Sequence, residues 1–303
     1  MLSRVGEQLY WMARYLERTD NTARLIKATT QQILDSSEPA NWRAPIDILG
    51  ADPLFDGREL AAHETSVMAF LIDDPYQPGS IHASVRAARE NARTVRELLP
   101  TEVWEGINQL QAALRNTPGS GGSRRWRLDG LRRLIAINQQ INGIIEGSLS
   151  HGPPYHLIML ARHLERADMT SRLIDSHTDI PAEEAHASGW MHTLHALDAY
   201  LMYRQSMSAR LDARSVINFL MLDPAFPRSV RFCLRRMGDA LLALPASSPV
   251  LTRLEQLDRA HVEARPQQLP PDALHRYIDD LQADLAALHA AIARHYFPAP
   301  IAC

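Results

Sequence analysis

The sequence predicts an all-α fold, an internally duplicated helical bundle with about five helices per repeat and a pseudo-twofold axis. Apolar residues recur at i, i+3, i+4 and i+7 along the 303 residues, which is the spacing of a buried helix face, and no segment shows sustained alternation of apolar and polar residues. Glycine is sparse, at 14 residues, and 46% of the residues are hydrophobic, so this is the composition of a folded globular chain.

The duplication is predicted from two pairs of matching segments. Ten of 14 residues are identical between ARYLERTDNTARLI at 13–26 and ARHLERADMTSRLI at 161–174. A second pair, at 66–80 and 215–229, shares S-V-x-x-F-L-x-x-D-P-x-x-P-x-S. Because the two matches follow in the same order, we expect one repeat in residues 1–150 and a second in residues 151–303, packed as one compact unit.

Proline, glycine and polar residues mark the expected ends of the helices. In the first half the breaks fall near residues 36–57, 74–80, 100, 117–124 and 150–154. In the second half they fall near residues 177–182, 204–211, 223–229, 245–249 and 264–271. Ser80 and Ser229 each follow a proline-containing corner and precede an apolar periodic run, so both are predicted to be helix N-caps.

The charge balance excludes several classes of function. A net charge of -3 gives no basic field for nucleic acid or an anionic membrane. Lys27 is the single lysine and lies outside any P-loop pattern, so we expect no nucleotide or pyridoxal cofactor in this chain. No stretch approaches the roughly 18 apolar residues of a membrane span, and the N-terminal charges do not suit a signal peptide. We therefore expect a cytoplasmic protein.

Metal binding is not predicted. Cys233 and Cys303 are too few for a zinc site, and Cys233 lies at an apolar periodic position typical of a core residue. Glu183 and His186 form a single E-x-x-H pattern, whereas di-iron bundles need two such helices and two further carboxylate helices.

One side of the first helix has an unusual composition. The side opposite its apolar stripe, within an arc of roughly 140°, combines aromatic and charged side chains: Tyr10, Trp11, Arg14, Glu17, Arg18, Asn21 and Arg24. Such a mixture indicates a covered face with paired charges. The second copy keeps matching charges at Arg162, Glu165, Arg166, Asp168 and Arg172. We therefore expect the two helices to face each other, with a carboxylate of one meeting a guanidinium of the other.

This face has two interpretations: a buried ion-pair network that holds the halves in register, or a ligand pocket. Asymmetry between the copies favours a pocket in the first half, with the second half mainly scaffold. Tyr10, Trp11 and Asn21 become apolar in the second copy, and two of the three polar groups at Glu90, Asn91 and Arg93 are lost there. We expect the site between the helix carrying residues 10–24 and the helix carrying residues 86–96. The candidate ligand-binding residues are Tyr10, Trp11, Arg14, Glu17, Arg18, Asn21, Arg24, Arg86, Glu90, Asn91, Arg93, Glu165, Arg166 and Arg172.

The segments LSRVGEQLYWMARYLERTDNTARLI, SIHASVRAARENARTVRELLPTEVWEGIN and LARHLERADMTSRLI together resemble the bacterial alpha-E family over essentially the whole chain. The resemblance implies a helical, cytoplasmic bacterial protein. It also implies a circularly permuted ATP-grasp protein as partner, encoded beside it or fused to it, often with a transglutaminase-like protein and a proteasome-like peptidase. Ala13 stands where the family pattern leads us to expect glycine.

Three functions remain open. The favoured one is a non-nucleotide component of an ATP-grasp-linked system that forms or modifies peptide bonds and binds a peptide, an amino acid or the ligase. Its arginines, including Arg93, would hold carboxylates, Glu17 and Glu90 would hold an amine or orient the arginines, and Tyr10 and Trp11 would stack on the ligand. The second is a purely structural protein. The third is a stand-alone amide hydrolase or transferase with Glu17 or Glu90 as general base, which requires a raised carboxyl pKa that neighbouring arginines oppose.

Overall fold

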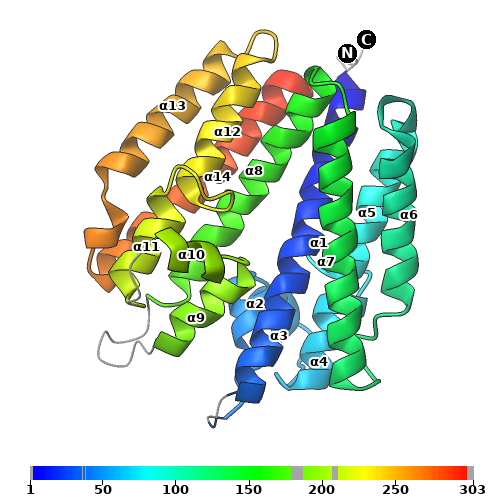
Figure 1. The fold of residues 1–303 in the computed structure, drawn as a ribbon, viewed down its shortest axis with the longest axis vertical. Coiled ribbons are helices and arrows are strands. Elements are labelled where there is room, and N and C mark those ends of the chain that lie inside the picture. The colour runs from blue at the N-terminus through cyan, green and yellow to red at the C-terminus, as the bar shows by residue number, and fades with distance from the viewer. Residues whose placement is uncertain (1–2, 36, 38, 179–186, 207–210, 299–303) are drawn as a thin grey trace.

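The computed structural model describes residues 3–35, 37, 39–178, 187–206 and 211–298. These residues form fourteen α-helices and no strand, which confirms the all-α prediction (Figure 1). The helices before residue 150 are α1 (Ser3–Asp35), α2 (Ala44–Ile48), α3 (Asp52–Asp56), α4 (Glu64–Met68), α5 (Ile81–Thr94), α6 (Thr101–Arg115) and α7 (Arg124–Ser148). Those after it are α8 (Pro153–Asp175), α9 (Ala187–Ala196), α10 (Tyr200–Ser206), α11 (Ala213–Leu222), α12 (Val230–Leu242), α13 (Ser248–Glu263) and α14 (Pro271–Tyr296).

Two long helices, α1 and α8, form the centre of the molecule (Figure 1). They pack against each other; α1 also contacts α5, α7 and α9, while α8 also contacts α12 and α14. Both are covered on more than one side, so α1 buries Leu9 and Met12 and also the polar Glu17 and Asn21. The prediction that the charged side of the first helix is covered is therefore confirmed. A buried charged face must satisfy its groups by pairing, which fixes how α1 and α8 meet.

The repeated D-P-x-x-P-x-S segments form the same corner in both halves. In the first half, Asp74 Oδ1 accepts the backbone N–H of Tyr76 at 2.8 Å and Ser80 Oγ accepts that of Ala83 at 3.0 Å. In the second half, the side chains of Asp223 and Ser229 accept backbone N–H groups in the same way. Both serines are thus the predicted N-caps, of α5 and α12. The corner thus fixes the position of the residue before each serine, which is Gly79 in the first half and Arg228 in the second.

The number of helices differs from the predicted five per half. Seven α-helices lie in each half of the described chain, because short helices form in segments that we expected to be loops. Among them, α2 and α3 have five residues each and begin with a proline in the first turn, where the missing N–H costs no hydrogen bond. The duplication itself stays a prediction.

Two further expectations concern particular residues and segments. Cys233 is fully buried, as predicted, and burial raises the pKa of its thiol to about 12. Glu183 and His186 lie outside the described residues. None of the helices in the described ranges combines the length and apolarity that crossing a membrane requires.

Candidate functional site

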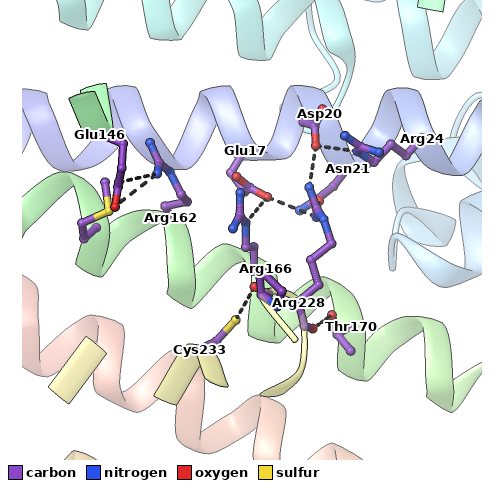
Figure 2. Close-up of polar contacts among 12 residues, drawn as sticks. Glu17, Asp20, Asn21, Arg24, Glu146, Arg162, Arg166, Thr170, Arg228 and Cys233 are labelled. Carbon is purple, nitrogen blue, oxygen red and sulfur yellow. Dashed lines mark hydrogen bonds and ion pairs between the residues drawn. The ribbon is translucent and has the colours of Figure 1, made fainter. Parts of the chain in front are cut away.

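The charged faces of α1 and α8 meet through two Glu-Arg dipeptides, Glu17–Arg18 and Glu165–Arg166. Each glutamate accepts hydrogen bonds from arginine of the other helix. Arg166 Nε donates to Glu17 Oε1 at 2.7 Å (Figure 2), and Arg18 Nε donates to Glu165 Oε1 at 2.7 Å. The predicted meeting of a carboxylate from one helix with a guanidinium from the other is confirmed, and it occurs twice.

Each glutamate has a second arginine, and the two second arginines come from different places. Glu165 also accepts a hydrogen bond from Arg14, which is on α1 like Arg18. Glu17 instead pairs with Arg228, at 3.2 Å, which comes from the corner before α12 (Figure 2). We call the group around Glu17 the enclosed crossing and the group around Glu165 the open crossing, for the reasons given below.

Both glutamates are ionised at neutral pH. Burial by itself would raise the pKa of Glu17, but Arg166 and Arg228 outweigh this effect and lower the pKa to about 2. Burial opposes ionisation of Glu165 in the same way, and Arg14 and Arg18 lower its pKa to about 2. A carboxylate with so low a pKa is a weak base at neutral pH, which argues against Glu17 as a general base.

The enclosed crossing has no room for a ligand. The side chain of Glu17 is 1% exposed and that of Arg228 is 10% exposed. Besides Glu17, Arg228 donates to Asp20 Oδ2 at 2.6 Å and to Asn21 Oδ1 at 2.8 Å (Figure 2). Arg24 donates to the same Asp20 oxygen at 2.7 Å. Glu17 and Arg24 are thus paired with protein side chains, so nothing in this geometry calls for a ligand there, and their predicted ligand role stays a prediction.

A cavity of about 220 Å³ lies at the open crossing. Its walls come from α1, α8, the segment that joins α2 and α3, and the corner before α5. It is lined by Arg18, Asn21, Thr22, Leu49, Gly50, Ala51, Leu54, Gln77, Pro78, Gly79, Glu165, Asp168, Met169 and Arg172. Four predicted site residues thus share one pocket: Arg18, Asn21, Glu165 and Arg172. The pocket lies between the two halves, whereas we had expected it within the first half.

One position in the repeated corner explains why this crossing is open. Gly79 stands in the first corner where Arg228 stands in the second. Arg228 fills the enclosed crossing with its side chain, and its backbone carbonyl accepts a hydrogen bond from Thr170 at 2.8 Å (Figure 2). Thr22, which matches Thr170 in the sequence repeat, lines the open pocket, and its buried hydroxyl has no partner in the described structure. Since Gly79 has no side chain, the equivalent space remains a cavity.

The aromatic residues of α1 do not reach the pocket. Tyr10 is fully buried, and its hydroxyl lies 2.9 Å from Nδ1 of His289, on α14. Trp11 stacks on Tyr15 and meets His289 edge-on. Tyr10 and Trp11 thus stack on protein rings, and their predicted stacking on a ligand stays a prediction. Burial raises the pKa of Tyr10, so its hydroxyl stays protonated.

The candidate residues of α5 do not join the α1 cluster either. This helix packs on α1, and its apolar residues, such as Val85 and Ala88, are buried. The arginines and the glutamate on its other side are exposed, and Asn91 is half-buried. Arg93 pairs with Glu90 on the helix surface at 3.1 Å, and Arg86 donates to the carbonyl of Pro75. The predicted site between α1 and α5 therefore stays a prediction, and the exposed Arg86, Glu90 and Arg93 do not lie with the charged residues of α1.

Two participants were missed by the sequence analysis. Arg228 and Gly79 occupy one of the positions at which the two corner segments differ, between a matching proline and a matching serine, and that difference was the signal that could have found them. Among the described residues, Asp175, His275 and Asp279 also form a group whose ligand atoms lie close enough for a metal ion. They are partly exposed and lie on α8 and α14, away from the lining of the pocket.

The Alpha-E family, described as a predicted alpha-helical domain with a conserved ER motif, matches residues 1–297. The chain belongs to this family. The chain itself carries a Glu-Arg dipeptide at each of the two crossings. An uncharacterized protein of Mycobacterium bovis and one of Mycobacterium tuberculosis are each 26% identical to the chain. The alignment with each is 310 residues long and covers 95% of this chain. The chain spans only 35% of the length of these relatives, and no solved structure matches it.

Proposed function

We propose that this alpha-E protein is the non-nucleotide component of a bacterial system that forms or modifies peptide bonds together with a circularly permuted ATP-grasp protein. The pocket at the open crossing is the place where it binds the substrate or the partner. The observation that carries the proposal is that one of two otherwise matching ER crossings contains a cavity lined by Arg18 and Arg172. A pocket with guanidinium groups suits the carboxylates that such systems handle.

The division of labour follows from what each chain supplies. Lys27 is the single lysine of this chain and lies in the middle of α1, far from any glycine-rich phosphate loop. An ATP-grasp partner would bring the nucleotide and its metal. The Mycobacterium relatives are nearly three times as long as the matched region, which leaves space for a fused partner domain. A transglutaminase-like protein is a further partner in this proposal, and we place the system in the cytoplasm.

The proposal includes an origin for the pocket. We infer that the two halves arose by duplication and that the first retained a ligand site, while a corner arginine closed the second. The repeated corner with its matching serine caps and the reciprocal glutamate–arginine pairs support this inference.

The first experiment is co-expression with the ATP-grasp protein encoded in the same gene neighbourhood. We expect the two proteins to co-purify, and the pair to consume ATP when it joins a carboxylate to an amine. Arg172→Gln should abolish the activity of the pair, because Arg172 lines the pocket. Arg93→Gln is the matched control, because Arg93 is exposed on α5 and should leave activity unchanged. Full activity of the Arg172 variant would remove the pocket from the proposal.

A purely structural function is the second candidate, and the enclosed crossing favours it. Glu17, Arg166 and Arg228 make a complete buried network that fixes α1 against α8 without any ligand. This candidate predicts that variants of the open pocket change stability alone. The stand-alone amide hydrolase is disfavoured by the low pKa of Glu17 and by the exposed surface position of Glu90. Turnover of amide substrates by the isolated chain without ATP would reverse that order.

A further inference from the structure

We propose that the open pocket binds one monovalent carboxylate, such as the carboxyl end of an amino acid or a peptide. The inference rests on the proposed function for the role of the pocket in peptide chemistry. The ligand class itself follows from the hydrogen-bonding groups and charges that line the cavity.

The pocket has unused donors and few unused acceptors. Arg18 donates through Nε and Nη2 to Glu165, at 2.7 and 3.1 Å. Arg172 donates through Nε and Nη2 to Asp168, at 2.9 and 3.3 Å. The third guanidinium nitrogen, Nη1, of each arginine has no hydrogen-bond partner among the described residues, whereas all four carboxylate oxygens are engaged. A ligand that brings acceptors would use these two nitrogens, and a carboxylate does so.

The charges of the open crossing also select an anion. Arg14, Arg18 and Arg172 surround Glu165 and Asp168, so three positive groups face two negative ones. The enclosed crossing does not offset the excess, because Arg24, Arg166 and Arg228 already balance its own carboxylates, which are Glu17, Asp20 and Asp198. One ligand carboxylate would balance the open crossing. A phosphate dianion would bring a second negative charge close to Glu165 and Asp168, so the geometry favours a carboxylate over phosphate.

Two glycines keep the space for the ligand. Gly50 has a φ of +61°, and a Cβ there would lie 2.9 Å from Arg172 Nη1, the nitrogen that is left for the ligand. A Cβ on Gly79 would lie 3.2 Å from the amide nitrogen of Gln77, which is the end of a flexible side chain. A larger side chain at position 79 has a precedent in this molecule, because Arg228 occupies the matching space of the enclosed crossing. Position 79 is therefore the place to close the pocket without removing a charged group.

The test is a calorimetric titration of the isolated full chain with three probes: trialanine, trialanine amide and inorganic phosphate. We expect trialanine to bind and its amide to bind at least about tenfold more weakly, since the amide lacks the charge and one of the two acceptor oxygens. Phosphate should bind more weakly than trialanine. Equal binding of acid and amide, tighter binding of phosphate, or no binding of trialanine would each overturn the proposal.

Two variants at one position connect binding to this pocket. Gly79→Arg places a guanidinium in the cavity as Arg228 does in the enclosed crossing, and it should abolish trialanine binding while the circular dichroism spectrum keeps its helical form. Gly79→Ala is the control and should retain binding. Unchanged binding in a folded Gly79→Arg protein would overturn the assignment of the site. Should that variant not fold, the comparison of acid and amide on the unaltered chain still decides the ligand class.

The titration separates this inference from the proposed function. It contains no ATP-grasp protein, so a failure to co-purify with that partner would leave the binding result intact. Conversely, the pair can be active while the alpha-E chain binds trialanine and trialanine amide equally. That result would overturn the carboxylate site and leave the proposed function standing.

Discussion

The enclosed and open crossings carry the same Glu-Arg dipeptide, yet one is a filled core and the other adjoins a cavity. In both, a glutamate of one central helix accepts hydrogen bonds from the arginine that follows the matching glutamate on the other. The difference lies outside these helices, at a corner that carries Arg228 in one half and Gly79 in the other. The comparison teaches that the dipeptide makes the pairing, whereas the corner residue decides whether a ligand has room.

The second arginine of each crossing shows how the open one keeps its glutamate satisfied. Arg14 reaches Glu165 directly. Its counterpart in the repeat, Arg162, does not reach Glu17 and lies 3.9 Å from Glu146 (Figure 2). Burial and the neighbouring Arg166 lower the pKa of Arg162 to about 10. Arg14 therefore replaces Arg228 as the second partner, and the cavity forms without leaving a buried carboxylate short of cations.

Acid should break both crossings together, and this is the largest effect we expect. The pKa of Glu17 and of Glu165 is about 2 in the folded chain, against 4.5 for a free glutamate. A depressed pKa gives stability that is complete above pH 4.5 and is lost as the pH falls toward 2, by about 3 kcal/mol for each carboxylate. Urea unfolding at a series of pH values measures this loss. A free energy of unfolding that stays constant across this range would contradict the pairing at both crossings.

Neutralising one glutamate at a time separates the two crossings at neutral pH. Glu17→Gln should cost about 3–5 kcal/mol, because it leaves Arg166 buried without a carboxylate and leaves Arg228 with Asp20 alone. Glu165→Gln should cost less, about 1–3 kcal/mol, because the side chain of Arg18 is 25% exposed and water in the pocket can solvate it. Denaturant unfolding of both variants gives the two values. Equal losses would mean that the open crossing is as dry as the enclosed one, and the pocket would have to be abandoned.

Opening the enclosed crossing should give a smaller effect that a solute can reverse. Arg228→Gly reproduces the glycine of the first corner and should cost about 2–3 kcal/mol, because Glu17 keeps Arg166 and Asp20 keeps Arg24. Millimolar guanidinium chloride should restore part of the lost melting temperature by occupying the new cavity. The unaltered protein, scanned with the same additive, is the control. If guanidinium chloride lowers the melting temperature of the variant as much as that of the unaltered protein, no equivalent cavity forms in the variant.

The sequence was sufficient for the features that depend on local pattern and repetition. Helical periodicity predicted the fold, and the identical segments predicted that a glutamate of one helix would meet an arginine of the other. It was insufficient where a side chain reaches across the fold, since Arg228 lies 208 residues from Asp20 along the chain. The contact of Tyr10 with His289 could not be predicted for the same reason, because the two residues are 279 residues apart.

The surface position of the α5 residues could not be predicted, for a different reason. A helix face with arginine, glutamate and asparagine looks the same in sequence whether it lines a pocket or faces water, and here Arg93 and Glu90 face water. Only the packing of the opposite, apolar face on α1 decides between these cases. Such a surface pair is easily tested, because its removal has a known small effect.

Glu90→Gln should therefore have the smallest effect. Its carboxylate pairs with Arg93 at 3.1 Å, with the side chains 52% and 59% exposed, so water and salt screen the interaction. We expect a change of less than about 0.5 kcal/mol in the free energy of unfolding and unchanged trialanine binding. Denaturant unfolding and calorimetry on the same preparation measure both. A tenfold loss of binding in this variant would return the site to the face of α5 where the sequence analysis had placed it, and the corner glycine would no longer account for where the ligand binds.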